Sequence, residues 1–146
     1  MNRRFTVEEA ERLLPEIRRL LHEALEQKRA LDSASRALQA LTQRAAWLGG
    51  ITIDRAAALE QRIARNAAET GLKAALDAIH SLGVIVKDLD VGLIDFLTSY
   101  QGRDVFLCWR LGEPSIQFWH SVDEGFGGRK PIDQNFLKSH RGDPAH

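Results

Sequence analysis

The spacing of apolar residues changes at Gly83, and this change constrains the fold more than any other feature of the sequence. Before Gly83, apolar residues recur every three or four positions, which is typical of amphipathic helices. After Gly83, short runs of Val, Ile, Phe and Trp are separated by glycine, which indicates strands and turns. Helices followed by strands predict an α+β fold and argue against a doubly wound sheet.

Two helices of roughly 40 and 28 residues are predicted by the first pattern. The first begins with Thr6–Glu9, a Thr-x-x-Glu capping box, and ends at Gly49–Gly50. The second begins at Thr52 or Asp54, because either residue can cap a helix. The short connection between them predicts a long antiparallel helical hairpin over residues 5–82.

The hairpin is expected to bury one apolar stripe and to need a partner. Leu59 and Ile63 belong to the stripe of the second helix, and Gly71 is expected to allow close approach of a neighbouring backbone. A 40-residue helix would be about 60 Å long, which exceeds the diameter of a compact domain of this size. We therefore expect a homo-oligomer or a protein partner bound through the hairpin, in the manner of a coiled coil.

A small antiparallel β-meander of three to four strands is predicted over residues 84–122, with the hairpin packed on it. The expected strands are 84–86, 93–97, 104–110 and 116–120. Residues 123–146 are rich in Gly and Pro and are expected to be irregular. We predict one domain over residues 1–146.

Charge and composition exclude several classes of protein. Twenty Lys and Arg balance twenty Asp and Glu, so the chain lacks the basic excess typical of nucleic-acid binders. No apolar run is long enough to cross a membrane. The single cysteine, Cys108, cannot form an internal disulfide. We expect a soluble cytoplasmic protein without membrane or nucleic-acid partners.

Polar residues near the predicted strand ends are candidates for binding a small ligand. These residues are Arg110, Glu113, His120, Arg129 and Asp88. The loop 125–130 adds backbone amides and two cations that could contact an anion. It is not a P-loop, because no Ser or Thr follows its lysine, and an ordinary glycine loop remains the simpler interpretation.

A divalent metal is the one cofactor that the sequence suggests. His120, Glu124 and Glu113 could bind it, which would suit a small metal-assisted hydrolase. Catalytic zinc sites usually have more closely spaced ligands, so a histidine packed beside Trp119 is the simpler interpretation. The segment starting at Asp88 fails the pattern of a calcium-binding loop.

Two further polar groups lie within predicted strands. Asp95 alternates with apolar neighbours and is expected to face solvent; if it were buried, it would need a partner such as Arg110. Cys108 has apolar neighbours and is expected to be an inert core thiol.

Several sequence blocks together resemble a known family. They are Phe5–Ala10, Leu13–Pro15, Gly83–Phe96, Val105–Pro114, Trp119–His120 and Gly125–Phe126 with Arg129 and Pro131. The chain resembles the bacterial family called domain of unknown function 2203 over roughly residues 4–132. The resemblance implies a soluble, one-domain bacterial protein and assigns no catalytic residue. We expect a non-catalytic interaction or small-ligand-binding module, with the metal-assisted hydrolase as the alternative.

Overall fold

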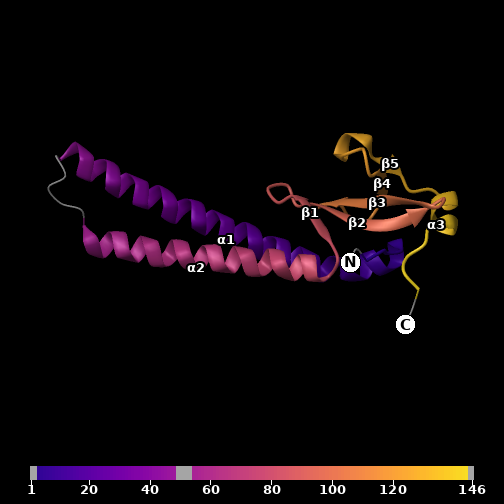
Figure 1. Ribbon diagram of the computed structural model, residues 1–146, viewed down its shortest axis with the longest axis horizontal. Coiled ribbons are helices and arrows are strands. Elements are labelled where there is room, and N and C mark those ends of the chain that lie inside the picture. Colours follow the sequence, from indigo (N-terminus) through magenta and orange to yellow (C-terminus); the bar gives the residue numbers. More distant parts are fainter. Residues whose placement is uncertain (1–2, 49–53, 145–146) are drawn as a thin grey trace. The chain divides into compact units, whose positions relative to one another are not determined.

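The protein has the predicted α+β fold. The computed structural model describes residues 3–48 and 54–144, so the predicted turn at Gly49–Gly50 and the alternative cap Thr52 lie outside the described residues. The elements follow the order α1 (Val7–Trp47), α2 (Arg55–Ser81), β1 (Ile85–Asp88), β2 (Leu93–Tyr100), β3 (Arg103–Arg110), β4 (Phe118–Ser121), η1 (Phe126–Gly128), β5 (Lys130–Pro131) and α3 (Gln134–Ser139) (Figure 1).

The chain divides into two compact units, which are described separately. The sheet unit contains Met1–Leu21 and Asp77–His146, and the hairpin unit contains His22–Leu76. Both long helices run through the boundary between the units. The expectation of one domain over residues 1–146 stays a prediction.

Both long helices begin at the residues that the sequence indicates. The Glu9 amide donates to Thr6 Oγ1 over 3.1 Å, and the Thr6 amide donates to Glu9 Oε1 over 3.0 Å, which completes the capping box. Asp54 caps α2 by accepting from the Ala57 amide over 3.0 Å. Gly83 follows α2 with a φ of +88°, a left-handed conformation that glycine adopts at little cost.

The sheet unit contains an antiparallel meander in the order β1-β2-β3-β4-β5, one strand more than predicted. The turn between β2 and β3 has positive φ at both central residues, Gln101 and Gly102. This two-residue geometry suits the right-handed twist of a hairpin. The fourth strand begins at Phe118, two residues later than predicted.

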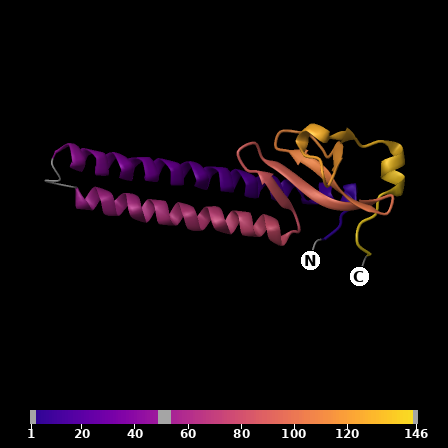
Figure 2. The same ribbon diagram turned by 45° about the horizontal axis from the view of Figure 1, so that its top comes forward.

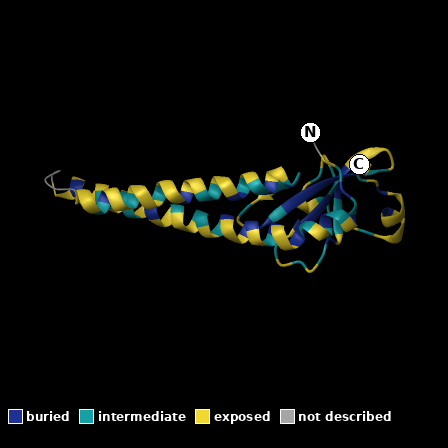
Figure 3. Ribbon diagram, turned by 90° about the horizontal axis from the view of Figure 1, so that it is seen from below, coloured by how far each residue is buried: buried dark blue, intermediate teal, exposed yellow. Residues whose placement is uncertain are grey.

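One face of the sheet forms the main hydrophobic core of this unit. Alternate residues of β2 and β3, including Ile94, Phe96 and Trp109, are fully buried in one cluster with Ile17 of α1 and Ile79 of α2. Figure 3 shows the continuous buried colouring of the central strands. Within this unit, the predicted helical cover therefore comes from the first turns of α1 and the end of α2.

Residues 123–144 include short regular elements, whereas the segment 123–146 was predicted to be irregular. These elements are η1, β5 and α3, and Asp133 caps α3 through the Phe136 amide. His140 accepts from the Val7 amide through Nε2 over 3.0 Å and donates through Nδ1 to the Phe136 carbonyl. A six-residue helix leaves a weak sequence pattern, and this one is held by tertiary contacts.

The hairpin unit consists of two antiparallel helices lying side by side (Figure 2). Leu59 and Ile63 were predicted to be buried but are 57% and 61% exposed. Gly71 was predicted to allow the backbone of a neighbouring element to approach closely. A Cβ at that position would instead lie 2.8 Å from the Gln27 side chain, so the close neighbour is a side chain.

Candidate functional site

Three polar side chains share the sheet face that points away from the main core. Asp95 of β2 lies directly opposite Cys108 of β3. His120 of β4 lies opposite Phe106, which precedes Cys108 by two residues on β3. Because side chains alternate along a strand, these residues lie on the face opposite Ile94. Asp95, Cys108 and His120 are nevertheless between 1% and 2% exposed. The second face of the sheet therefore contains a buried polar cluster.

Asp95 and His120 form a buried pair. His120 Nε2 lies 3.0 Å from Asp95 Oδ2, and His120 Nδ1 lies 2.8 Å from the Ser121 carbonyl oxygen. A carbonyl oxygen only accepts, so Nδ1 carries a hydrogen and donates to it. A proton must then lie between Nε2 and Oδ2, because both atoms are otherwise acceptors.

This pair corrects the prediction for Asp95. The carboxylate was expected to face solvent, or to pair with Arg110 if buried. It is buried, and its partner is His120. The Arg110 side chain is exposed. The other carboxylate oxygen, Oδ1, is buried and has no hydrogen-bond partner among the described residues.

Cys108 lies beside this pair. One ligand atom each from Asp95, Cys108 and His120 can be chosen so that all three lie within 4.8 Å of one another. Burial raises the pKa of the Cys108 thiol to about 12, and the nearby negative charge of Asp95 contributes to the increase. The metal-free thiol is therefore protonated at neutral pH, in agreement with the prediction of an unreactive core cysteine.

We expect Cys108 to resist thiol reagents in the folded, metal-free protein. With a pKa of about 12, only about one thiol in 10⁴ is ionised at pH 8. Reaction with a disulfide reagent in the presence of a chelator should be slow in buffer and rapid in denaturant. Because the unfolded thiol ionises at lower pH than the folded one, raising the pH above about 9 should also destabilise the fold. Equally rapid reaction in both solvents at pH 8 would contradict the expectation.

A second polar pair lies next to the cluster. Arg129 Nη2 donates to Glu113 Oε1 over 2.6 Å and to the Cys108 carbonyl over 3.2 Å. The Arg129 guanidinium lies 4.1 Å from the centre of the Phe118 ring and 4.6 Å from that of Phe126. Glu113 Oε1 also accepts from the Arg110 amide over 2.7 Å. These contacts join the β3–β4 connection to the segment around η1.

The structure brings together some of the predicted ligand-binding residues. Glu113 and Arg129 form the pair described above, and the Arg110 guanidinium lies 5.9 Å from the centre of the Phe126 ring. Asp88 is exposed, and its Oδ1 accepts from the Asp90 amide, as a turn-capping residue does. The positive charge of Arg129 is already balanced by Glu113, which weakens the case for an anion site in the glycine loop.

The predicted metal ligands His120, Glu124 and Glu113 have separate partners. One ring nitrogen of His120 contacts Asp95 and the other contacts the Ser121 carbonyl oxygen. Glu124 pairs with Lys130, which lowers the pKa of this carboxyl group. Within residues 3–48 and 54–144, the side chains close enough to share a metal ion are those of Asp95, Cys108 and His120. The two glutamates do not belong to this group.

Sequence reasoning treated Asp95 and Cys108 separately and did not combine them with His120. The turn signal at Gln101 and Gly102 could have related Asp95 to Cys108, because a two-residue turn there places residue 95 opposite residue 108. The position of His120 depends on the longer connection over residues 111–117, whose sequence does not set the register of β4.

The described fold is thus an α+β protein in which a helical hairpin accompanies a five-stranded meander with a buried polar cluster. The chain belongs to the family of uncharacterized conserved proteins DUF2203, whose family model matches residues 3–132. Neither the curated proteins nor the solved structures compared with the chain include a match. No helix among the described residues is both long and apolar enough to cross a membrane.

Proposed function

We propose that this protein is a non-catalytic interaction module whose hairpin unit pairs with a second copy of the chain. The proposal rests on the distribution of apolar side chains in the hairpin unit. The buried apolar residues described in this unit are all alanines. They are Ala24, Ala34, Ala45, Ala58, Ala68 and Ala75. Large apolar side chains such as Leu59 and Ile63 are exposed instead.

Five exposed apolar residues of α2 and the exposed Thr70 follow a helical spacing of their own. We call this set the outer seam, and all its members are exposed: Ala56, Leu59, Ile63, Ala67, Thr70 and Ala74. Successive members are three or four positions apart, so they lie along one side of the helix. Leu59 and Ile63 are the two large members, and small residues on either side would let another helix approach closely.

A second copy of the chain is the occupant that we favour. Alanine is the only apolar residue type that the described part of the hairpin unit buries fully, and leucines such as Leu38 and Leu72 are only half-buried. The two helices therefore leave apolar surface uncovered, and isolated helices depend on tertiary packing for most of their stability. Two hairpins that join through the same seam would form a four-helix arrangement, in which each covers the exposed leucine and isoleucine of the other. A two-fold axis makes such a contact self-complementary.

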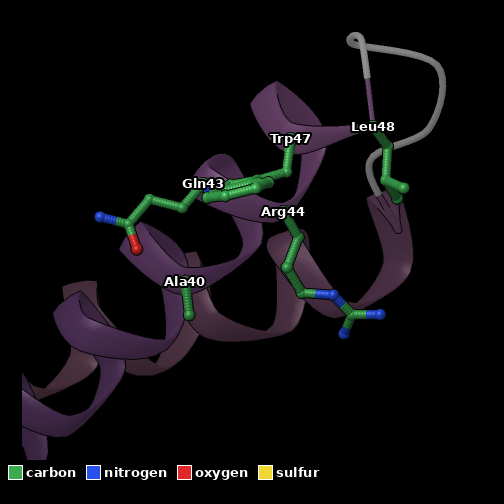
Figure 4. Close-up of a pocket in the computed structure, with 5 residues that line it drawn as sticks. All are labelled: Ala40, Gln43, Arg44, Trp47 and Leu48. Carbon is green, nitrogen blue, oxygen red and sulfur yellow. The ribbon is translucent and has the colours of Figure 1, made fainter.

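The end of α1 carries a separate apolar feature. Trp47 is 90% exposed and, with Ala40, Gln43, Arg44 and Leu48, lines a shallow pocket. Figure 4 shows the indole ring lying beside the Gln43 side chain. Four of these residues lie on α1 and Leu48 directly follows it, so none is a member of the outer seam.

Sedimentation velocity across a range of concentrations tests the proposal. The wild-type protein should form a dimer, and Ile63→Glu should weaken dimerisation at least about tenfold, because it places a charge in an apolar contact. Ala64→Glu is the matched control, since it adds the same charge at the adjacent exposed position outside the seam. A wild-type monomer at every concentration, or equal effects of the two variants, would refute the proposal.

A further inference from the structure

We propose that Asp95, Cys108 and His120 bind one divalent transition-metal ion of the zinc class. The three side chains offer an oxygen, a sulfur and a nitrogen ligand from three neighbouring strands. Imidazole and thiolate ligands are preferred by zinc and its neighbours, whereas calcium and magnesium prefer oxygen. The ligand set therefore indicates the class of cation.

The distances suit a single ion. Zinc binds nitrogen and oxygen at about 2.0–2.2 Å and sulfur at about 2.3 Å, so tetrahedral ligands lie about 3.3–3.6 Å apart. His120 Nε2 and Asp95 Oδ2 are 3.0 Å apart, and one ligand atom from each of the three residues can be chosen so that all lie within 4.8 Å of one another. Shifts of about 1 Å or less in each side chain would bring the ligands into coordination. Three protein ligands leave a fourth position for water or another group.

The orientation of His120 is that of a metal ligand. Its Nδ1 donates to the Ser121 carbonyl, which leaves Nε2 directed at the Asp95 carboxylate. Histidines that bind metals usually donate their other ring hydrogen to a carbonyl or carboxylate in this way. The contact between Nε2 and Oδ2 also requires a positive species between two acceptor atoms, and a metal ion can replace the proton there.

The second oxygen of Asp95 provides an independent observation. Asp95 is 1% exposed, and its Oδ1 has no hydrogen-bond partner among the described residues. A buried carboxylate oxygen without a partner is costly, so such atoms are rare in folded proteins. A cation coordinated through Oδ1, or through both carboxylate oxygens, would satisfy this atom.

The charges balance when the ion binds. The ion displaces the thiol proton of Cys108 and the proton shared by Asp95 and His120, so two protons leave for each ion. The resulting thiolate and carboxylate carry two negative charges, which match the two positive charges of the metal. A neutral buried site avoids the large desolvation cost of an isolated ion. Metal coordination deprotonates a thiol outright, even where the free thiol would stay protonated.

Cobalt(II) is a suitable probe because thiolate coordination produces a charge-transfer band in the near ultraviolet. The full chain would be unfolded under reducing conditions and refolded with Co²⁺, so that the buried ligands are accessible during loading. We expect one ion per chain, a thiolate band, and loss of the band when Zn²⁺ is added. Cys108 is the only cysteine, so the band in the wild-type protein identifies its ligand without any variant.

Variants extend the test to the other two ligands. Asp95→Asn and His120→Gln should each weaken Co²⁺ binding at least about tenfold, and Cys108→Ala should remove the band. His80→Gln replaces an exposed histidine and should leave binding unchanged. Ile63→Glu should also retain the band, which separates this proposal from that of pairing through the outer seam.

The proposal fails if the refolded wild-type protein shows no thiolate band with Co²⁺. It also fails if Cys108→Ala, Asp95→Asn or His120→Gln binds Co²⁺ with wild-type affinity. Circular dichroism identifies any variant that does not fold, and in that case the wild-type spectrum decides the result.

Discussion

Asp95→Ala is expected to lower the free energy of unfolding of the metal-free protein by about 1–3 kcal/mol. Asp95 and His120 are both almost fully buried and face each other over 3.0 Å. Removing the carboxylate leaves the imidazole Nε2 without a partner in a site that water does not reach. The loss should be visible as a lower midpoint in urea denaturation monitored by circular dichroism, with a chelator present.

A double variant provides the control for this prediction. Asp95→Leu combined with His120→Phe removes both polar partners and replaces them with apolar groups, which is often far less destabilising than removing one. We expect the double variant to recover much of the stability that Asp95→Ala loses. A loss below about 1 kcal/mol for Asp95→Ala would mean that the pair contributes no more than an exposed ion pair.

Gly92→Ala is expected to destabilise the sheet unit by about 2–4 kcal/mol. Gly92 has a φ of +68°, and a Cβ at this position would lie 2.5 Å from Leu111 Cβ. Because Leu111 Cβ is attached directly to the backbone, it cannot move away by a side-chain rotation. The alanine would therefore add both a left-handed backbone cost and a steric clash. Thermal or urea unfolding would measure the change.

Gly102→Ala isolates the backbone contribution. Gly102 has a similar φ of +74°, but a Cβ there would have no neighbour within 4 Å. We expect a loss of about 1 kcal/mol, which reflects the left-handed conformation alone. Equal losses in the two variants would show that the contact between Gly92 and Leu111 does not constrain the fold.

Local sequence signals predicted much of the fold correctly. The capping residues Thr6, Glu9 and Asp54 make the expected hydrogen bonds, and Gly83 follows α2 in the expected conformation. These signals succeed because each depends on residues within one turn of one another. The same locality explains why α3 was not predicted in the C-terminal segment, because this helix is held through His140 by the distant Val7 amide.

The apolar stripe of α2 shows where periodicity becomes ambiguous. The spacing that placed Leu59 and Ile63 in a buried stripe is genuine, because both lie on one side of the helix. Periodicity alone does not indicate which side of α2 faces the neighbouring helix. In the hairpin unit the fully buried positions belong to small residues such as Ala58 and Ala68, whereas Leu72 is half-buried and Leu59 and Ile63 are exposed.

The sequence by itself determined the elements that arise from neighbouring residues: two long helices, a change to strands after Gly83, and the tight turn that sets Asp95 opposite Cys108. Only the tertiary structure decided that these two side chains would meet His120. The connection over residues 111–117 permits more than one register of β4, and packing around Arg129 and Glu113 accompanies the observed one. A shift of one residue would have turned His120 to the other face of the sheet, away from Asp95.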